Sequence, residues 1–261
     1  MLRIIVCIKQ VPDTTEVKID PKTGTLIREG IPVIINPDDK AGIEVALCLK
    51  AQYNAHVTVL SMGPPQAESA LKEAYAMGAD RVILLTDRAF AGSDTWATSL
   101  ALAYAIKKID YDLIICGRQA IDGDTAQVGP QIAEHLNLPQ ISYVTEIEKH
   151  DNSVIVKKVF EDEYQRIKVT LPCLLTVLRE MNHPRYMTIS RIFEICTEKK
   201  VEKMTISDIG LEPERTGLNA SPTKVKKTMT KGAKSAGKVH DCDSKEAAKL
   251  IIEKLKEKYI L

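Results

Sequence analysis

The feature that most constrains this fold is a regular alternation of short apolar runs with helix-forming segments over the first 136 residues. Runs rich in isoleucine, valine and leucine occupy residues 2–8, 55–60, 81–85 and 112–115. Segments with apolar residues at helical spacing follow them. Apolar runs this continuous are typical of parallel strands buried on both faces. The alternation therefore predicts an α/β fold with a doubly wound parallel sheet and right-handed crossovers.

Two loop-to-helix junctions carry helix-start signals. Asn36, Pro37, Asp38 and Asp39 precede apolar residues at helical spacing, and either aspartate is expected to cap that helix. Residues 87–95 form a second junction of this kind before another helical segment.

A longer junction, residues 116–131, separates the strand predicted at 112–115 from a helix predicted over 131–136. Three glycines and two aspartates lie in it, with few bulky side chains. Glycine lets a backbone approach a ligand closely, and the N–H groups that begin a helix favour an anion. The pattern is compatible with a nucleotide phosphate site and, equally, with an ordinary strand-to-helix turn.

The composition excludes several classes of function. A net charge of +1 and an aromatic content of 5% argue against nucleic-acid binding. No apolar run reaches the roughly 18 residues of a membrane helix, and residues 1–9 are expected to form a first strand, not a secretion signal. The six cysteines are widely spaced, so we expect reduced, buried thiols in a cytoplasmic protein, without disulfides or a metal site.

The sequence offers no recognisable catalytic constellation. Phosphate-binding P-loops, the G-x-G-x-x-G fingerprint and the G-x-S-x-G elbow are all absent, and the five histidines are dispersed. Five loops are expected together at the carboxyl ends of the parallel strands, namely residues 7–9, 36–39, 61–64, 94–95 and 117–131. A cleft of this kind without catalytic side chains is typical of a protein whose bound cofactor does the chemistry.

The pattern changes after Pro139. Four further runs predict adjacent strands in an antiparallel layer or edge, at residues 142–148, 152–159, 164–170 and 173–178. Residues 179–192 predict a polar loop with isolated apolar side chains, and residues 14–30 predict a small hairpin insertion.

The C-terminal part predicts little core of its own. Residues 194–237 are rich in lysine with little periodicity, which is compatible with a solvated face or with a segment lying along a partner. Asp243 and Glu246 then begin a helix whose apolar residues share one face. Either the chain's own domain or another subunit must cover that face.

Two segments carry a family resemblance. Residues 156–167 and 172–176 fit the β-subunit signature of electron transfer flavoproteins, and the chain is similar to that family over essentially its full length. The resemblance implies the adenine-nucleotide α-hydrolase-like sheet, which agrees with the alternation above. Four segments fall where the family binds an adenine nucleotide, at residues 6–12, 36–37, 62–64 and 122–131.

The family has two branches with different ligands. Ordinary β subunits hold AMP, and the only FAD lies mainly on the α subunit. In bifurcating members the β subunit holds a second FAD, which accepts a hydride from NADH. One electron then passes to ferredoxin or flavodoxin, and the other to the α-subunit FAD and a partner flavin dehydrogenase, of the acyl-CoA or another type. Residues 122–130, 87–95 and 221–223 resemble the bifurcating branch, which implies FAD.

The rim loops and the resemblance together define a predicted cofactor site. Its members are Cys7, Lys9, Asn36, Asp39, Met62, Gly63, Asp94, Thr95, Gly117, Arg118, Gln119, Asp122, Gly123, Asp124, Thr125, Ala126, Gln127, Val128, Gly129, Pro130, Gln131 and Thr223. Thr125, Gln127 and Gln131 are the candidate direct donors, and Pro130 is expected in the first turns of a helix. Arg118 is either a cation that tunes a flavin or one partner of a surface ion pair.

The resemblance also implies how the chain assembles. Residues 179–192 resemble the family's recognition loop for the partner dehydrogenase, with Ile189 as its apolar anchor and Arg185 and Tyr186 beside it, although Ile189 could equally pack on its own domain. Residues 1–193 form the predicted nucleotide-binding domain, and residues 194–261 an extended arm and helix on the α subunit. A stress-type regulatory module on the same sheet is an alternative that would not need residues 140–261.

Overall fold

The computed structural model of this chain describes residues 1–13, 32–225 and 237–260. The hairpin predicted over residues 14–30 and part of the basic stretch lie outside the described residues. Among the described helices, none is long and apolar enough to cross a membrane.

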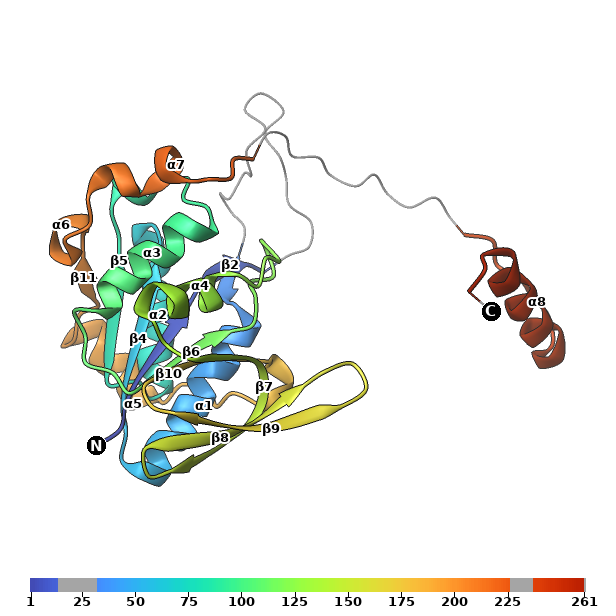
Figure 1. Cartoon of the computed structure of the whole chain (residues 1–261), viewed down its shortest axis with the longest axis horizontal. Helices are drawn as coiled ribbons and strands as arrows, with labels where there is room; N and C mark the ends of the chain where they lie inside the picture. Colours follow the sequence, from blue (N-terminus) through green and yellow to red (C-terminus); the bar gives the residue numbers. More distant parts are fainter. Residues whose placement is uncertain (14–31, 226–236, 261) are drawn as a thin grey trace.

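A large, mostly parallel sheet forms the centre of the molecule (Figure 1). Strand β1 (Arg3–Ile8) pairs in parallel with β4 (His56–Met62) on one side and β6 (Leu113–Gly117) on the other. Next to β4 lies β5 (Arg81–Leu85), and β11 (Glu202–Met204) pairs with β5, both in parallel. Within the described residues the strand order is β11-β5-β4-β1-β6-β10-β7-β8-β9. The predicted doubly wound parallel sheet is confirmed.

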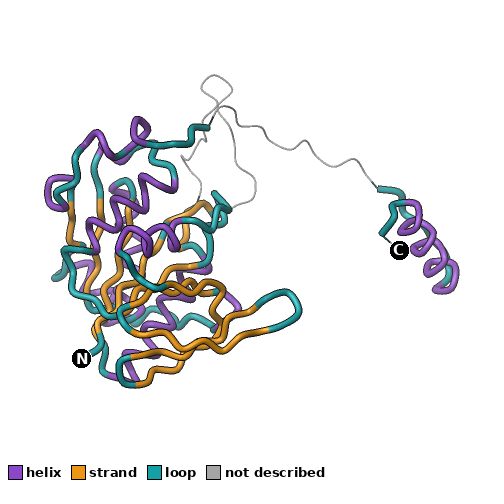
Figure 2. Tube along the Cα trace, viewed as in Figure 1, coloured by secondary structure: helices purple, strands orange, loops and turns teal. Residues whose placement is uncertain are grey.

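Helices cover both faces of this sheet (Figure 2). Helices α1 (Pro37–Tyr53) and α2 (Glu68–Met77) pack into one apolar core, and α3 (Thr95–Ile106) and α4 (Val128–Leu136) pack into the other. Successive residues of β1 and β6 enter opposite cores, because side chains alternate along a strand. The continuous apolar runs in the sequence are explained by this burial on both faces.

The four late strands do not form one antiparallel layer. Strands β7 (Gln140–His150), β8 (Ser153–Val159) and β9 (Tyr164–Thr170) form an antiparallel extension, as predicted. The fourth, β10 (Cys173–Val177), instead lies between β6 and β7 and is parallel to both, which corrects the prediction. All five of its residues are buried, whereas β9 is mostly exposed, so the two runs belong to different environments.

Two short strands lie outside the main sheet. Strand β2 (Gln10–Pro12) follows β1 closely and pairs antiparallel with β3 (Val33–Ile35). Short 3₁₀ turns interrupt the loops at η1 (Pro65–Ala67), η2 (Arg88–Phe90), η3 (Arg179–Met181) and η4 (Pro213–Arg215).

The segment after residue 188 is more ordered than the sequence predicts. A helix, α5 (Ile189–Thr197), replaces the end of the predicted polar loop. Strand β11 and helix α6 (Ile206–Ile209) follow, and Ile195 and Val201 join the core on the α1 and α2 side. The expectation that residues after 194 lack a core is therefore wrong as far as Leu211, because this segment uses the open edge of the existing sheet. A short helix, α7 (Gly217–Ala220), comes after it.

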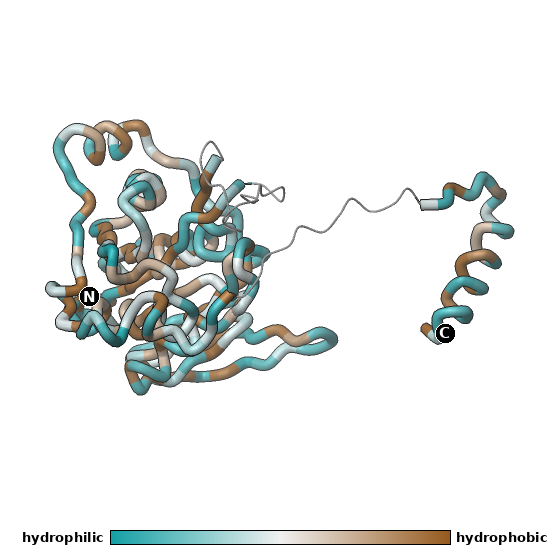
Figure 3. The backbone as a smooth tube through the Cα atoms, turned by 90° about the horizontal axis from the view of Figure 1, so that it is seen from above, coloured by the Kyte–Doolittle hydropathy of each residue, from teal (hydrophilic) through white to brown (hydrophobic). Residues whose placement is uncertain are grey.

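The last described element is α8 (Ser244–Glu257), none of whose residues is buried. The Asp243 carboxylate accepts hydrogen bonds from the N–H groups of Lys245 and Glu246, so the predicted start is confirmed. Apolar residues recur along one side of the helix (Figure 3), and Ile251 and Ile252 are exposed. Packing of residues 194–261 on an α subunit stays a prediction.

The cysteines divide into two groups. Cys7, Cys116 and Cys173 are buried, as predicted. Cys48, Cys196 and Cys242 are exposed, which corrects the prediction for those three. Burial raises the pKa of the Cys173 thiol to about 12, so that thiol is unreactive near neutral pH.

Candidate functional site

The predicted loops meet at one edge of the sheet, as expected for parallel strands. In the strand register, Cys7 of β1 lies between Leu60 of β4 and Cys116 of β6, and Gly117 lies beside Val177 of β10. The loops that follow these strands are consequently neighbours. We call this edge the rim.

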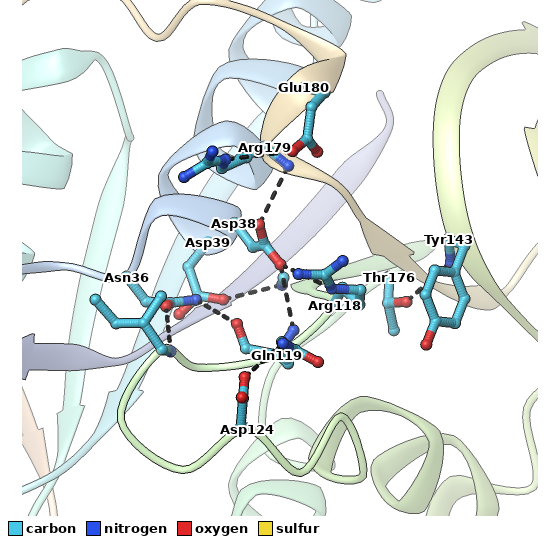
Figure 4. Close-up of polar contacts among 12 residues, drawn as sticks. Asn36, Asp38, Asp39, Arg118, Gln119, Asp124, Tyr143, Thr176, Arg179 and Glu180 are labelled. Carbon is cyan, nitrogen blue, oxygen red and sulfur yellow. Dashed lines mark hydrogen bonds and ion pairs between the residues drawn. The ribbon is translucent and has the colours of Figure 1, made fainter. Parts of the chain in front are cut away.

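Two buried aspartates at the start of α1 join the rim loops together. Neither caps the helix, which corrects the prediction: Asn36 occupies the N-cap position, without a side-chain cap bond. The carboxylate of Asp39 instead accepts the N–H of Lys9 at 2.8 Å and the N–H of Gly117 at 3.0 Å. One buried carboxylate thereby links the ends of β1 and β6 (Figure 4).

Asp38 and Asn36 extend these links to the next loops (Figure 4). The Asp38 carboxylate accepts the N–H of Arg179 at 3.2 Å and that of Gln119 at 3.4 Å. Arg118 Nε lies 3.4 Å from the same carboxylate. The Asn36 amide donates to the Gln119 carbonyl at 2.9 Å and accepts from Ile121 at 3.1 Å. The backbone after β6 is thus held at Gln119 and Ile121, in addition to Gly117.

The electrostatics of these aspartates follow from their burial. Burial raises the pKa of Asp39 to about 7, and hydrogen bonds from Lys9, Asn36 and Gly117 limit the rise. Burial also raises the pKa of Asp38, opposed chiefly by the Arg118 guanidinium. Since these carboxylates already occupy the N–H groups of Lys9, Gly117 and Gln119, a bound anion must use donors farther along the loop.

Glycine is required at two points of close approach. A Cβ on Gly117 would lie 2.7 Å from the Asp39 nitrogen and 2.8 Å from Asp38 Cβ. A Cβ on Gly129 would lie 2.8 Å from Thr176 Cγ2. These two predicted site residues therefore serve first to bring the loop against α1 and β10.

The loop beyond Gln119 is open, in contrast to its beginning. Asp122, Gly123, Asp124, Thr125 and Gln127 are exposed, and Asp124 and Ala126 have positive φ angles of 56° and 53°. Lys9 Nζ pairs with the Asp122 carboxylate at 2.7 Å, which fixes one side of the loop. This segment, residues 120–127, is called the outer loop below.

Helix α4 begins at Val128, three residues before its predicted start, and Pro130 lies in its first turn as expected. Its N-cap residue, Gln127, makes no side-chain cap bond. Within the described chain, no acceptor is found for the backbone N–H groups of Thr125, Ala126, Gln127, Val128 and Gly129. A helix start with unpaired N–H groups and a positive dipole end is suited to an anion.

The start of α3 faces this loop. Thr95 Oγ1 donates to Gln127 Oε1 at 2.8 Å, so the amide nitrogen of Gln127 stays available as a donor. Asp94 caps α3 through the Ala97 N–H at 3.0 Å and accepts the N–H and the hydroxyl of Thr223 at 2.9 and 2.8 Å. Burial would raise the pKa of Asp94, but these bonds outweigh it and hold the pKa below its usual range. The structure therefore brings Asp94, Thr95 and Thr223 to the rim.

A small cavity of about 120 Å³ adjoins the outer loop. Four of the predicted residues line it: Lys9, Met62, Gly63 and Asp122. Gln10, Val11, Pro12 and Pro64 also line it, and they belong to the segments 6–12 and 62–64 that the resemblance assigned to an adenine nucleotide. The sequence reasoning missed Val33, Gln66 and Ala67. Val33 lies on the three-residue strand β3, and Gln66 and Ala67 lie on the 3₁₀ turn η1, so these elements are too short to leave a periodic pattern in the sequence. A cavity this small fits one ring of a ligand and not a whole dinucleotide.

The predicted docking residues fall into two groups, those exposed on the surface and one that is bonded within its own chain. Ile189 and Tyr186 are 74% and 95% exposed, and Phe193, which is 66% exposed, was missed. Arg185, in contrast, directs its guanidinium at the buried Glu44 of its own chain.

Comparison with known proteins gives a consistent result. A family model described as an electron transfer flavoprotein domain matches residues 23–209. The electron transfer flavoprotein subunit beta of Clostridium acetobutylicum is 55% identical over 260 residues, all of both chains. The caffeyl-CoA reductase–Etf complex subunit CarD of Acetobacterium woodii is 52% identical, and the acryloyl-CoA reductase electron transfer subunit gamma of Anaerotignum propionicum is 45% identical, both over all of each chain.

These matches include residues 140–261, which a stress-type regulatory module would not need. They also agree with the signature segments on β8, β9 and β10. The chain belongs to the electron transfer flavoprotein family, as a protein of its β-subunit type.

Proposed function

We propose that the rim of this β subunit holds FAD and that the subunit works in an NADH-dependent, electron-bifurcating complex of the cytoplasm. Bound there, FAD would supply the chemistry of accepting a hydride from NADH and releasing single electrons. One electron would go to ferredoxin or flavodoxin. The other would go through the α-subunit FAD to a partner flavin dehydrogenase.

The observation that carries this proposal is the set of backbone N–H groups at residues 125–129, which have no acceptor within the described chain. They stand at the positive end of α4, beside the open outer loop. A pyrophosphate carries two negative charges and needs several such donors. The residues present therefore fit a dinucleotide phosphate at this position.

The remaining residues of the rim would orient the cofactor. The amide nitrogen of Gln127 is directed by Thr95 and can donate to a phosphate or a ribose. Lys9 neutralises Asp122, which keeps that carboxylate from repelling an anion. The cavity beside Met62 and Gly63 would hold one ring of the ligand. Arg118 belongs to the inner side of the rim, where Asp38 balances its charge.

AMP is the alternative ligand, since a single phosphate also fits a helix start. The choice of FAD rests on residues 122–130, whose sequence resembles the bifurcating branch, and on relatives named as parts of CoA-reductase complexes. In the proposed complex the exposed Ile189 and Tyr186 contact the partner dehydrogenase, and the arm packs on the α subunit through the residues after Leu211.

The direct experiment is to purify the chain with its α subunit and count the nucleotides released on denaturation. Two FAD and no AMP per heterodimer is the expected result. One FAD with one AMP would overturn the FAD proposal in favour of the ordinary branch.

A double substitution, Thr125→Ala with Gln127→Ala, tests the position of the site. We expect flavin occupancy of the β site to fall about tenfold, which corresponds to roughly 1.4 kcal/mol of binding, while the α-site flavin stays bound. The matched control is Thr170→Ala with Gln165→Ala on the exposed strand β9. Equal occupancy in the two variants would show that the site lies elsewhere.

A further inference from the structure

The segment between the rim and α5, residues 179–188, is called the strap here, because it is tied along one side of α1. Its first tie is the Arg179 N–H on the Asp38 carboxylate at 3.2 Å. The next is the Asn182 amide, which donates to the Ala41 carbonyl at 3.0 Å. Arg185 then binds Glu44, and Thr188 donates its N–H to the Ala76 carbonyl of α2 at 3.0 Å. Because the α1 partners recur every three residues, the strap follows one side of that helix.

The tie between Glu44 and Arg185 is the strongest of the four. Glu44 is buried, and its Oε2 accepts both the backbone N–H and Nε of Arg185 at 2.9 Å. Its Oε1 accepts Nη2 of the same arginine at 2.8 Å, with the Cys48 thiol donating from 3.4 Å. Burial would raise the pKa of Glu44, but the bonds from Arg185 outweigh it and lower the pKa below its usual range. Charge-assisted bonds in this fork geometry are both strong and directional.

This tie fixes the backbone of Arg185 as well as its side chain. Exposed apolar residues follow at once: Tyr186 and Met187 on the strap, and Ile189 and Phe193 on α5. These four residues form the apolar patch. Met181 of the strap packs against the core on the α1 and α2 side, but no strap residue is itself buried in either core. Polar ties therefore determine where the strap lies beyond Met181.

We propose that Glu44 and Arg185 are positioning residues, which hold the apolar patch in the geometry that a partner flavoprotein with an apolar surface binds. The inference rests on the docking role proposed above. It also gives Arg185 a different function from the direct partner contact that the sequence predicted, since its guanidinium is already engaged within the chain.

The test uses the purified heterodimer and the flavin dehydrogenase that co-purifies with it. For Arg185→Gln we expect the KM for the dehydrogenase to rise about tenfold, or roughly 1.4 kcal/mol, with kcat and flavin content unchanged. Hydrogen exchange at residues 185–193 should accelerate. Arg185→Lys keeps the charge but loses the fork, so its KM should lie between those of the wild type and Arg185→Gln.

A second variant guards against general destabilisation. Arg185→Gln leaves a buried charge without its partner, whereas Glu44→Gln with Arg185→Gln removes both charges and is expected to fold normally. The KM should stay raised in this double variant. The matched control, Arg166→Gln, breaks the exposed pair between Arg166 of β9 and Glu148 of β7 and should leave the KM unchanged.

The Ile189→Glu variant distinguishes a wrong docking surface from a wrong positioning role for Glu44 and Arg185. If Ile189→Glu leaves the KM unchanged, the docking surface itself is wrong. If Ile189→Glu raises the KM while the double variant matches the wild type in both KM and hydrogen exchange, the positioning role is overturned. If the KM rises equally in Arg166→Gln, the loss of any surface positive charge explains the effect, and the positioning role is overturned as well.

Discussion

The inner rim and the outer loop lie side by side but are built in opposite ways. The inner rim comprises Asn36, Asp38 and Asp39 with residues 117–119, to which they bond. In the inner rim, Asp38, Asp39 and Asn36 are buried, and each bonds to at least two backbone groups from other loops. In the outer loop, the side chains of Asp122, Asp124, Thr125 and Gln127 are exposed, and two non-glycine residues have positive φ angles. The N–H groups that follow have no acceptor in the described chain.

This difference separates a structural scaffold, the inner rim, from the proposed binding surface, the outer loop. The two carboxylates and the Asn36 amide of the inner rim are already bonded to backbone groups of neighbouring loops, so these groups are not available to a ligand. The function of the inner rim is to fix where the outer loop begins. The outer loop and the start of α4 keep their donors available, which a binding site requires. Substitutions in the first region should therefore change stability, and those in the second should change ligand retention.

Gly117→Ala should produce the largest effect of this kind. The added Cβ would meet the backbone of Asp39 and the side chain of Asp38, and neither can move without breaking its own bonds. We expect a loss of about 3 kcal/mol in the free energy of unfolding, measured by urea denaturation of the heterodimer. Gly123→Ala is the control, because its Cβ would meet nothing within 4 Å. Similar losses in the two variants would break the distinction between rim and loop.

Asp39→Ala should follow in size. It leaves the N–H groups of Lys9 and Gly117 buried without an acceptor, which should lower the free energy of unfolding by about 2 kcal/mol. The comparison variant in the outer loop is Asp122→Ala, which removes only a partly exposed pair with Lys9 and should lower it by under about 1 kcal/mol. Urea midpoints of both variants provide the measurement. A reversed order would mean that the scaffold lies in the outer loop.

The sequence predicted the framework of the molecule well, because burial on both faces leaves continuous apolar runs that can be read directly. It misplaced β10, although the difference was visible: Cys173, Leu174 and Leu175 are consecutive apolar residues, while residues 164–170 are largely polar. The run was grouped with its neighbours because of its position in the chain. Which strand it lies beside depends on contacts distant in sequence.

The prediction that Asp38 or Asp39 caps α1 was wrong for a related reason. Asp38 and Asp39 follow Pro37, and this local pattern is typical of a helix start, so it predicted caps. Their partners, residues 9, 117, 119 and 179, are distant in sequence and become neighbours only when the sheet forms. Likewise, Arg185 could be assigned to the docking segment, but nothing local shows that Glu44 engages it. Local patterns indicated which loops meet at the rim, whereas the bonds between those loops required the tertiary structure.

The ionisation of Asp39 in the inner rim should make the stability of the protein depend on pH. Its folded pKa of about 7 lies above the ordinary 3.8, so folding favours the protonated form. The stability that this preference contributes is fully present below about pH 3.8 and is lost as the pH rises through about 7. Against Asp39→Asn, which cannot titrate, the wild type should lose up to about 1.4 kcal/mol per pH unit over that interval. Parallel urea midpoints for the two proteins across this range would contradict the assignment.

Thr223→Val should give the smallest change in stability and decides to which region the α3 start belongs. The substitution removes the hydroxyl that donates to Asp94 at 2.8 Å, while the N–H of Thr223 can still bind the same carboxylate. Because the residue is exposed, we expect a loss of only about 0.5 kcal/mol in the free energy of unfolding.

If residues 221–223 border the cofactor, the β-site flavin should nevertheless dissociate several times faster from Thr223→Val, as measured by fluorescence on dilution of the heterodimer. Thr170→Val on β9 provides the baseline. A dissociation rate equal to that baseline would assign Asp94 and Thr223 to the scaffold, with the cofactor site limited to the outer loop and the start of α4.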